Sequence, residues 1–404
     1  MKRIKKPLNT ALVLAALSLT NHVARAAYSE PASYTNAPTT ITLGSPGYET
    51  TGADDSAAFS DAINDVAAAG GGIVWVPEGD YSLVGVEMKS NVHLRIRTGS
   101  ILRMQAEGLM FWFGGGIENV SIRGAGGRFT VNMGNFDTSR FITGNGVDNM
   151  LVANIDIEDP HETVYSSISL GWDRIRDETP SNVTVRNISC LNKEHYGYGI
   201  IQAQAASDSF FTNLEGHGGV PVRLETGWKL MNLAKRGGVF NIKATNITSK
   251  DGQAAVMMQP HTITNGDVFI NHVNSVGSEF TVVLEKGGTW KYSAQEVQDY
   301  GLATGTFGMI SVGNAHGAYH SSGVPTRYSR LDNYTPSELQ KVFRDPGKIS
   351  GHSGPSIAVV GNYGDSSSLT TWNISGTGGY VNPLISDEDD EYNHSSADKK
   401  RPSL

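Results

Sequence analysis

The feature that most constrains the fold is an asparagine followed by an aliphatic residue, which recurs at intervals of 33, 26 and 33 residues. The copies lie in short alternating segments bounded by Gly, Asn or Asp: Asn154-Ile155, Asn187-Ile188, Asn213-Leu214 and Asn246-Ile247. One coil of a parallel solenoid plus a loop of variable length produces such spacings. Stacked coils bury the inner face that one coil cannot bury alone, and asparagines at equivalent corners can stack as ladders. The repeat predicts an all-β fold, a right-handed parallel β-helix.

A β-sandwich is the competing architecture, but the chain lacks hairpin dipeptides and its loop lengths are irregular. The 47 glycines in 404 residues fit a protein with many turns. With 39 % apolar and 18 % charged residues, the chain is too apolar and too weakly charged to be a disordered protein. Its net charge of −8 argues against nucleic acid as a partner.

The segment Asp54 to Ala69 has helical spacing of apolar residues and ends at three glycines, so we expect a helix that caps the first coil. A second helix is expected to begin after Thr335, with Pro336 at its first position and Glu338 completing a capping box. The expected organisation is a signal peptide at 1–26, a β-helix catalytic domain at 27–288, an insertion or subdomain at 289–355, final coils at 356–384 and an acidic polar tail at 385–404.

The N-terminus resembles a bacterial export signal. Four basic residues precede the apolar stretch Ala11 to Leu19, and Ala24-Arg25-Ala26 supplies small residues for cleavage. We therefore expect a secreted protein, extracellular or periplasmic, which has no membrane segment after cleavage and is a monomer. The single cysteine, Cys190, cannot form an internal disulfide and is expected in the core.

A local excess of positive charge indicates an anionic ligand. Between positions 217 and 250 there is one acid, Glu225, and there are six basic residues: Arg223, Lys229, Lys235, Arg236, Lys243 and Lys250. Such an island attracts an anionic polymer, and the Arg223 guanidinium could grip a sulfate or carboxylate in a bidentate contact. Glu225 could be a catalytic acid or simply the charge partner of these cations.

Further candidates flank this island. His195, Tyr196 and Tyr198 lie among glycines, where they could contact a sugar or form an ordinary turn with stacked aromatic residues. Gln202 could position a water or a hydroxyl, and His261 could shuttle a proton or serve a purely structural role. The sequence contains no zinc-ligand spacing, phosphate loop or nucleophile elbow.

Four segments together resemble the iota-carrageenase family, glycoside hydrolase family 82: 196–204, 222–226, 255–261 and 265–268. The likeness extends loosely over 54–288. The resemblance implies a secreted β-helix enzyme that hydrolyses β-1,4 bonds of sulfated galactans with inversion. It implies Glu225 as general acid, Gln202 as a residue that holds a water or an ion, and His261 as a residue that assists the substrate or transition state. It also implies that no organic cofactor is needed, and it leaves room for a structural calcium or sodium ion.

One departure from the family concerns the catalytic base. The family carries an aspartate two residues after the glutamate, and this chain has Gly227 there. Inversion needs a base about 6.5–9.5 Å from the acid, and glycine supplies none. Asp173, Asp208 and Asp267 are unranked candidates for that base.

Two other functions remain open. A β-helix polysaccharide lyase needs no carboxylate base, because Arg223, Lys229, His195 or Tyr198 could abstract a proton beside a uronate carboxylate. A non-catalytic polysaccharide-binding solenoid is the third hypothesis, and Gly227 is its main support.

Overall fold

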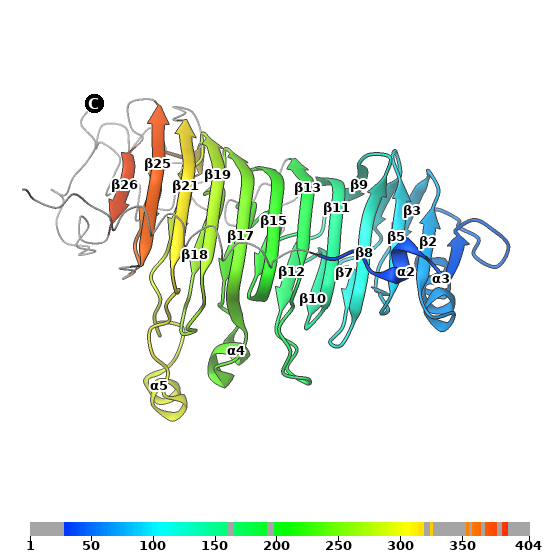
Figure 1. The fold of residues 1–404 in the computed structure, drawn as a ribbon, viewed down its shortest axis with the longest axis horizontal. Coiled ribbons are helices and arrows are strands. Elements are labelled where there is room, and N and C mark those ends of the chain that lie inside the picture. Colours follow the sequence, from blue (N-terminus) through cyan, green and yellow to red (C-terminus); the bar gives the residue numbers. More distant parts are fainter. Residues whose placement is uncertain are drawn as a thin grey trace, which may run out of the picture.

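The computed structural model describes residues 28–159, 165–191, 198–318, 324–325, 353–354, 358–364, 368–377 and 382–386. The chain forms a right-handed parallel β-helix, as the asparagine repeat predicted, with its coils stacked along the long axis of the molecule (Figure 1). Two parallel sheets, which we call sheet A and sheet B, enclose one apolar core.

Sheet A runs in the order β1 (Thr39–Thr42), β2 (Gly72–Val76), β5 (Val92–Arg97), β8 (Glu118–Ala125), β11 (Asp148–Glu158), β13 (Thr184–Leu191), β15 (Ala205–His217), β17 (Gly238–Lys250), β19 (Val268–Val276), β21 (Ile310–Ala318) and β25 (Leu369–Thr377). A branch of this sheet holds β3 (Asp80–Leu83), β6 (Ile101–Met104) and β9 (Phe129–Asn132). Sheet B runs in the order β4 (Val86–Glu87), β7 (Leu109–Phe113), β10 (Arg140–Asn145), β12 (Ile168–Gly171), β14 (Ile201–Ala203), β16 (Val222–Glu225), β18 (Val256–Gln259), β20 (Phe280–Leu284), β24 (Ala358–Asn362) and β26 (Asn382–Ser386). A separate antiparallel pair joins β22 (Val324–Pro325) and β23 (Ser353–Gly354). The helices are α2 (Ala32–Thr35), α3 (Ser56–Ala68), α4 (Lys229–Ala234) and α5 (Ala294–Tyr300).

The repeated asparagines bend the strands of sheet A at one corner of four successive coils, those of β11, β13, β15 and β17. Asn154, Asn187, Asn213 and Asn246 all adopt the left-handed backbone region, with φ between 54° and 63°. Asparagine reaches this region at lower cost than other non-glycine residues, because its short amide can hydrogen-bond locally. The Asn187 amide also donates to Asn154 Oδ1 at 2.7 Å, which is one rung of the expected ladder. The repeat therefore marks a conformational requirement of the coil.

Helix α3 covers the first coil, as predicted (Figure 1). Its face of Phe59, Ala62, Ile63 and Val66 is fully buried. The helix gives way to Gly70, whose φ of 90° is readily reached only by a residue without a side chain.

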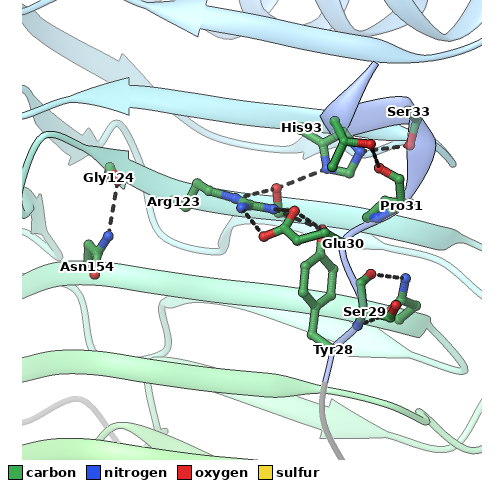
Figure 2. Close-up of polar contacts among 12 residues, drawn as sticks. Tyr28, Ser29, Glu30, Pro31, Ser33, His93, Arg123, Gly124 and Asn154 are labelled. Atoms are coloured by element: carbon green, nitrogen blue, oxygen red, sulfur yellow. Dashed lines mark hydrogen bonds and ion pairs between the residues drawn. The ribbon is translucent and has the colours of Figure 1, made fainter. Parts of the chain in front are cut away.

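A segment that we call the N-terminal strap, residues 28–35, crosses the outer face of sheet A (Figure 2). The Tyr28 backbone donates to Thr184 Oγ1 at 2.8 Å, and Glu30 receives two hydrogen bonds from Arg123 at 2.6 and 3.1 Å. The Arg123 guanidinium also lies 3.8 Å from the centre of the Tyr34 ring. The strap thereby connects β8 and β13, which are separated in sheet A by β11.

The predicted insertion at 289–355 is wrong for part of its length. Strand β21 lies in sheet A between β19 and β25, and its Ile310, Val312 and Ala315 are buried in the common core. The solenoid therefore continues through this region, and β21 is one of its strands. Helix α5 was not predicted; Ser293 caps it in a reciprocal pair with Glu296. The expected helix after Thr335 lies outside the described residues, as does most of the acidic tail.

Cys190 is buried in the core, as expected. In the described part of the chain, no helix is long and apolar enough to cross a membrane.

Candidate active site

The candidate site lies on the outer face of sheet B. Leu224 points into the core, so its strand neighbours Arg223 and Glu225 project outward. Gln202 on β14 is in register with Arg223 on β16, so both side chains lie on the same face of adjacent coils. The outward side chains of the two strands therefore meet.

Glu225 is at the centre of a buried polar cluster. Its Oε2 accepts hydrogen bonds from Arg223 Nε at 2.7 Å and from Gln202 Nε2 at 3.2 Å, and its Oε1 lies 3.0 Å from His261 Nε2. Lys291 Nζ lies 3.9 Å from the same Oε1. The structure thus brings together Gln202, Glu225 and His261, the three residues to which catalytic roles were assigned.

A tight turn aims His261 at Glu225. The residue follows β18 and adopts φ 48°, in the left-handed region. Its backbone carbonyl is fixed by the N–H groups of Gly288 and Gly305, at 2.7 and 2.8 Å. The imidazole is 1 % exposed, its Nδ1 has no hydrogen-bond partner among the described residues, and its ring centre lies 5.6 Å from that of Trp290. Because a carboxylate only accepts hydrogen bonds, the 3.0 Å contact with Glu225 requires a proton on Nε2; Lys291 Nζ, which only donates, lies farther from the same nitrogen, at 3.4 Å.

Gly227 makes room for this imidazole. A Cβ atom at position 227 would stand 2.7 Å from His261 Nε2 and 3.3 Å from Glu225 Oε1. Any side chain at 227 would therefore displace His261. In this chain, His261 occupies the space beside Glu225 that a residue at 227 would otherwise enter.

The surroundings of Glu225 hold it as a carboxylate. Burial opposes its ionisation, but the charge of Arg223 and the hydrogen bonds from His261 and Arg223 outweigh burial, so the pKa of Glu225 lies well below its ordinary value. A group that donates a proton must first receive one, and His261 is the hydrogen-bonded neighbour that can deliver it.

The basic island is largely neutralised, which corrects the expectation from the sequence. The partners come from elsewhere in the chain: Lys229 pairs with Glu296, Arg236 with Asp177, and Lys250 with Glu215. The charge count over 217–250 overstated the local potential, because acids from distant segments face these cations. The first two pairs connect α4 to α5 and to the loop after β12. The Lys229 and Arg236 side chains stay 56 % and 60 % exposed, so both remain accessible to a ligand.

The other predicted binding residues fall in different places. Tyr198 lies beneath Arg223, whose guanidinium carbon is 4.7 Å from the ring centre. Lys235 ends α4 in a left-handed turn and is exposed. His195 and Tyr196 lie outside the described residues.

The three aspartates considered as base are all held elsewhere. The Asp208 carboxylate accepts from Asn241 on the outside of sheet A, and Asp267 accepts from the backbone N–H of Met309. Asp173 is fixed within its own loop by the N–H of Ile175. None of these contacts involves the Glu225 cluster.

A carboxylate that the sequence did not single out lies closer in register. Leu224 pairs with Met258, and Met258 pairs with Leu284. Glu285 therefore follows Glu225 two coils away on the same face, about 10 Å along the stack at the usual strand spacing. It is 8 % exposed.

Open clefts flank the cluster on both sides. A pocket of about 420 Å³ is lined by Pro260, Glu285 and Phe307, beyond His261. On the other side, pockets of about 700 and 210 Å³ share Asn145 and Trp228. The Glu225 cluster thus lies between clefts that follow the outer face of sheet B. Among the described residues, no three His, Cys, Asp or Glu side chains cluster so as to hold a metal ion.

Several residues of this site could not be picked out from the sequence. Glu285 carried a signal, an acid directly after an apolar strand, but its register with Glu225 needed the strand pairing. Trp290 and Lys291 lie in the stretch assigned to an insertion, and only the path of the chain from β20 to α5 brings them to His261. Arg140, which lines the pocket of about 210 Å³ together with Trp228, was also missed.

Known proteins are similar to this chain in sequence and in fold. No protein-family model matches the chain. A curated iota-carrageenase from Zobellia galactanivorans is 31 % identical over an aligned length of 387 residues, and the match covers 80 % of this chain and 78 % of the relative. An iota-carrageenase from Alteromonas macleodii is 35 % identical over an aligned length of 257 residues, and the match covers 58 % of this chain and 50 % of the relative.

Solved structures are similar over nearly the whole chain. A 1,3-α-1,4-β-D-galactose-4-sulfate-3,6-anhydro-D-galactose-2-sulfate 4 galactohydrolase superimposes with a TM-score of 0.77 at 25 % identity, covering 91 % of this chain and 92 % of its own. An iota-carrageenase complexed to iota-carrageenan fragments has the same fold, with a TM-score of 0.74 at 23 % identity over 91 % of this chain and 93 % of its own. The extent and level of identity to the Zobellia enzyme place the chain in a family: it belongs to the iota-carrageenases, which are glycoside hydrolases.

Proposed function

We propose that this protein hydrolyses a sulfated galactan such as iota-carrageenan, cleaving β-1,4 bonds with inversion, with Glu225 as the general acid. The observation that carries the proposal is the buried Glu225 carboxyl, hydrogen-bonded by Gln202, Arg223 and His261 between clefts on the outer face of sheet B. The relatives named above, which carry the name iota-carrageenase, support the substrate class. We further propose that the protein is exported and acts as a monomer without an organic cofactor.

Proton supply is the first requirement of this mechanism. In the resting site the Glu225 carboxyl is ionised, so it must take up a proton before each bond cleavage. A protonated His261 would donate its Nε2–H to Glu225 Oε1 over 3.0 Å and pass that proton to the carboxyl as charge develops on the leaving oxygen. The pair therefore works with one shared proton, which passes from His261 to Glu225 and then to the leaving oxygen.

The base is the second requirement, and we assign it to Glu285. Its backbone lies about 10 Å from that of Glu225 along the stack, near the upper end of the separation of about 6.5–9.5 Å that the carboxyl groups of inverting enzymes require. Gln259 occupies the intervening coil, where its amide can orient the attacking water. Aspartate at position 227 is not needed in this arrangement.

The test compares the release of reducing ends from iota-carrageenan by the unaltered protein and by Glu225→Gln. We expect the variant to lose turnover by about 10²–10⁴-fold, the usual contribution of a general acid, while it still binds the polymer. Glu215→Gln is the matched control, because Glu215 lies on sheet A in an ion pair with Lys250 and should leave turnover unchanged.

Three results would contradict the proposal. Unchanged turnover in Glu225→Gln would remove the general acid. A product that absorbs in the ultraviolet would indicate a lyase. Retention on the polymer with no new chain ends would indicate a binding protein. Inversion itself is checked by the anomeric configuration of the first product, measured by NMR.

A further inference from the structure

A second polar pocket lies on the outer face of sheet B, on the N-terminal side of the Glu225 cluster. It has a volume of about 210 Å³ and is lined by residues of β10, β12, the end of β14 and the start of α4. At the usual strand spacing, β12 and β10 are about 10 and 14 Å from β16, which carries Glu225. The pocket is therefore outside the reacting centre but on the same face.

Four side chains of this pocket carry hydrogen-bonding atoms that have no partner among the described residues. They are Arg140 Nε, Thr143 Oγ1, Ser169 Oγ and Gln204 Oε1, and each of these atoms is buried. Buried polar groups are nearly always hydrogen-bonded, and leaving one unsatisfied is costly. Four such atoms around one hollow indicate a site whose hydrogen bonds are completed by what enters it.

Arg140 is held in place without a counter-charge. Its guanidinium carbon lies 3.5 Å from the centre of the Tyr165 ring, and Tyr165 in turn packs edge-on against Tyr198. Burial lowers the pKa of Arg140, and no carboxylate in the described part of the chain offsets it. A planar cation fixed by stacking, with a free Nε–H, is suited to an oxyanion such as sulfate.

Trp228 supplies an apolar wall to the same pocket. It packs against Trp172, with ring centres 6.0 Å apart, which fixes its orientation. A rigid aromatic wall opposite an arginine and three neutral polar groups combines the contacts that a sugar ring, its hydroxyls and an attached sulfate require.

We propose that this pocket is a subsite for one sulfated sugar unit of the polymer, remote from the bond that is cleaved. This inference rests on the proposed function. Arg140 binds the sulfate, Thr143, Ser169 and Gln204 bind hydroxyls, and Trp228 contacts the ring. Because the contacts are made away from the reacting atoms, they contribute to binding in the ground and transition states alike and act mainly on KM.

The test measures binding of an iota-carrageenan hexasaccharide to the Glu225→Gln protein by calorimetry. Adding Arg140→Gln should weaken binding by about 10- to 100-fold, and adding Ser169→Ala should weaken it by about 2- to 10-fold, the ranges for a charged and a neutral hydrogen bond. Arg97→Gln is the matched control: Arg97 lies exposed on sheet A, and its loss should leave the affinity unchanged.

A desulfated hexasaccharide separates sulfate recognition from a general effect on the fold. For this probe, the penalty of Arg140→Gln should largely disappear while that of Ser169→Ala remains. Because the two probes are compared on the same folded variant, the comparison tests sulfate recognition even where Arg140→Gln lowers stability.

Three outcomes overturn the inference. Equal hexasaccharide affinity with and without Arg140 means that the pocket is no subsite, while the proposed function stands if the protein still releases reducing ends. An equal Arg140 penalty for both probes means that no sulfate is bound there. If neither cleavage nor hexasaccharide binding is found, the proposed function fails and the sulfated-sugar assignment fails with it.

Discussion

Replacing Gly227 by alanine gives the sharpest test of how the site is assembled. The added Cβ would stand 2.7 Å from His261 Nε2, 3.0 Å from its Cδ2 and 3.3 Å from Glu225 Oε1. The backbone at 227 does not occupy the left-handed region, so alanine is compatible with its conformation. The whole effect must therefore come from the clash with His261.

The magnitude follows from what the imidazole loses. Moving His261 breaks its hydrogen bond to the Glu225 carboxylate, and hydrogen bonds to charged groups are worth about 1.5–3 kcal/mol. At about 1.4 kcal/mol for each factor of ten, kcat should fall by about 10- to 150-fold. The free energy of unfolding should change less. Overpacking lowers it by about 1–3 kcal/mol, and the reduced conformational freedom of the unfolded chain offsets about 0.4–1 kcal/mol of that loss.

The assay is a double-mutant cycle on kcat with Gly227→Ala and His261→Ala. If the clash is the cause, Gly227→Ala should cost nothing further once His261 is absent. Gly227→Asp should also lower turnover, although it restores the residue expected from the family resemblance. Additive losses in the cycle, or higher activity in Gly227→Asp, would refute the assignment of this space to His261 and of the base to Glu285.

Three further predictions follow. Glu285→Gln should lower kcat by about 10²–10⁴-fold with little change in polymer affinity; full activity would exclude Glu285 as the base. Glu30→Gln should lower the free energy of unfolding by about 1–3 kcal/mol, because the buried Arg123 loses its ionic partner. Asp80→Asn removes the partner of the exposed Arg103 and should lower it by at most about 1 kcal/mol. Chemical denaturation measures both changes. Burial, with a smaller contribution from Arg123, lowers the pKa of His93 to about 3, so the unfolded chain takes up this proton first as the pH falls. Stability should therefore decline between the ordinary histidine pKa of about 6.5 and pH 3, by up to about 1.4 kcal/mol per pH unit, and the decline should be shallower in His93→Gln; an unchanged slope would contradict this reading.

The solenoid could be predicted because its signals are local. A left-handed corner selects asparagine at Asn154, Asn187, Asn213 and Asn246, whatever the rest of the chain does. Helix α3 is likewise marked by the apolar spacing of its own residues and by the glycines that end it. Strand β21 was misassigned because the excursion that carries α5 interrupts the repeat before it, although the strand itself rejoins sheet A.

The site was predicted only as far as coil stacking determines it. The catalytic roles of Gln202, Glu225 and His261 came from the family resemblance. Coil stacking explains why Gln202 and Glu225 meet, because outward residues on successive parallel strands lie side by side. The direction of the His261 side chain depended on its turn, and the vacancy at Gly227 that receives the imidazole became visible only in three dimensions.

The sequence by itself determined the coil, its corners and the face on which the polar residues project, because these follow from backbone preference and the alternation of a strand. Only the tertiary structure decided which charges are paired and which are left for a ligand. The partners of Lys229 and Arg236 are acids from distant excursions, and Arg140 meets none among the described residues. Electrostatic interactions act through space, so charge counted along the chain cannot reveal which groups the fold brings within reach.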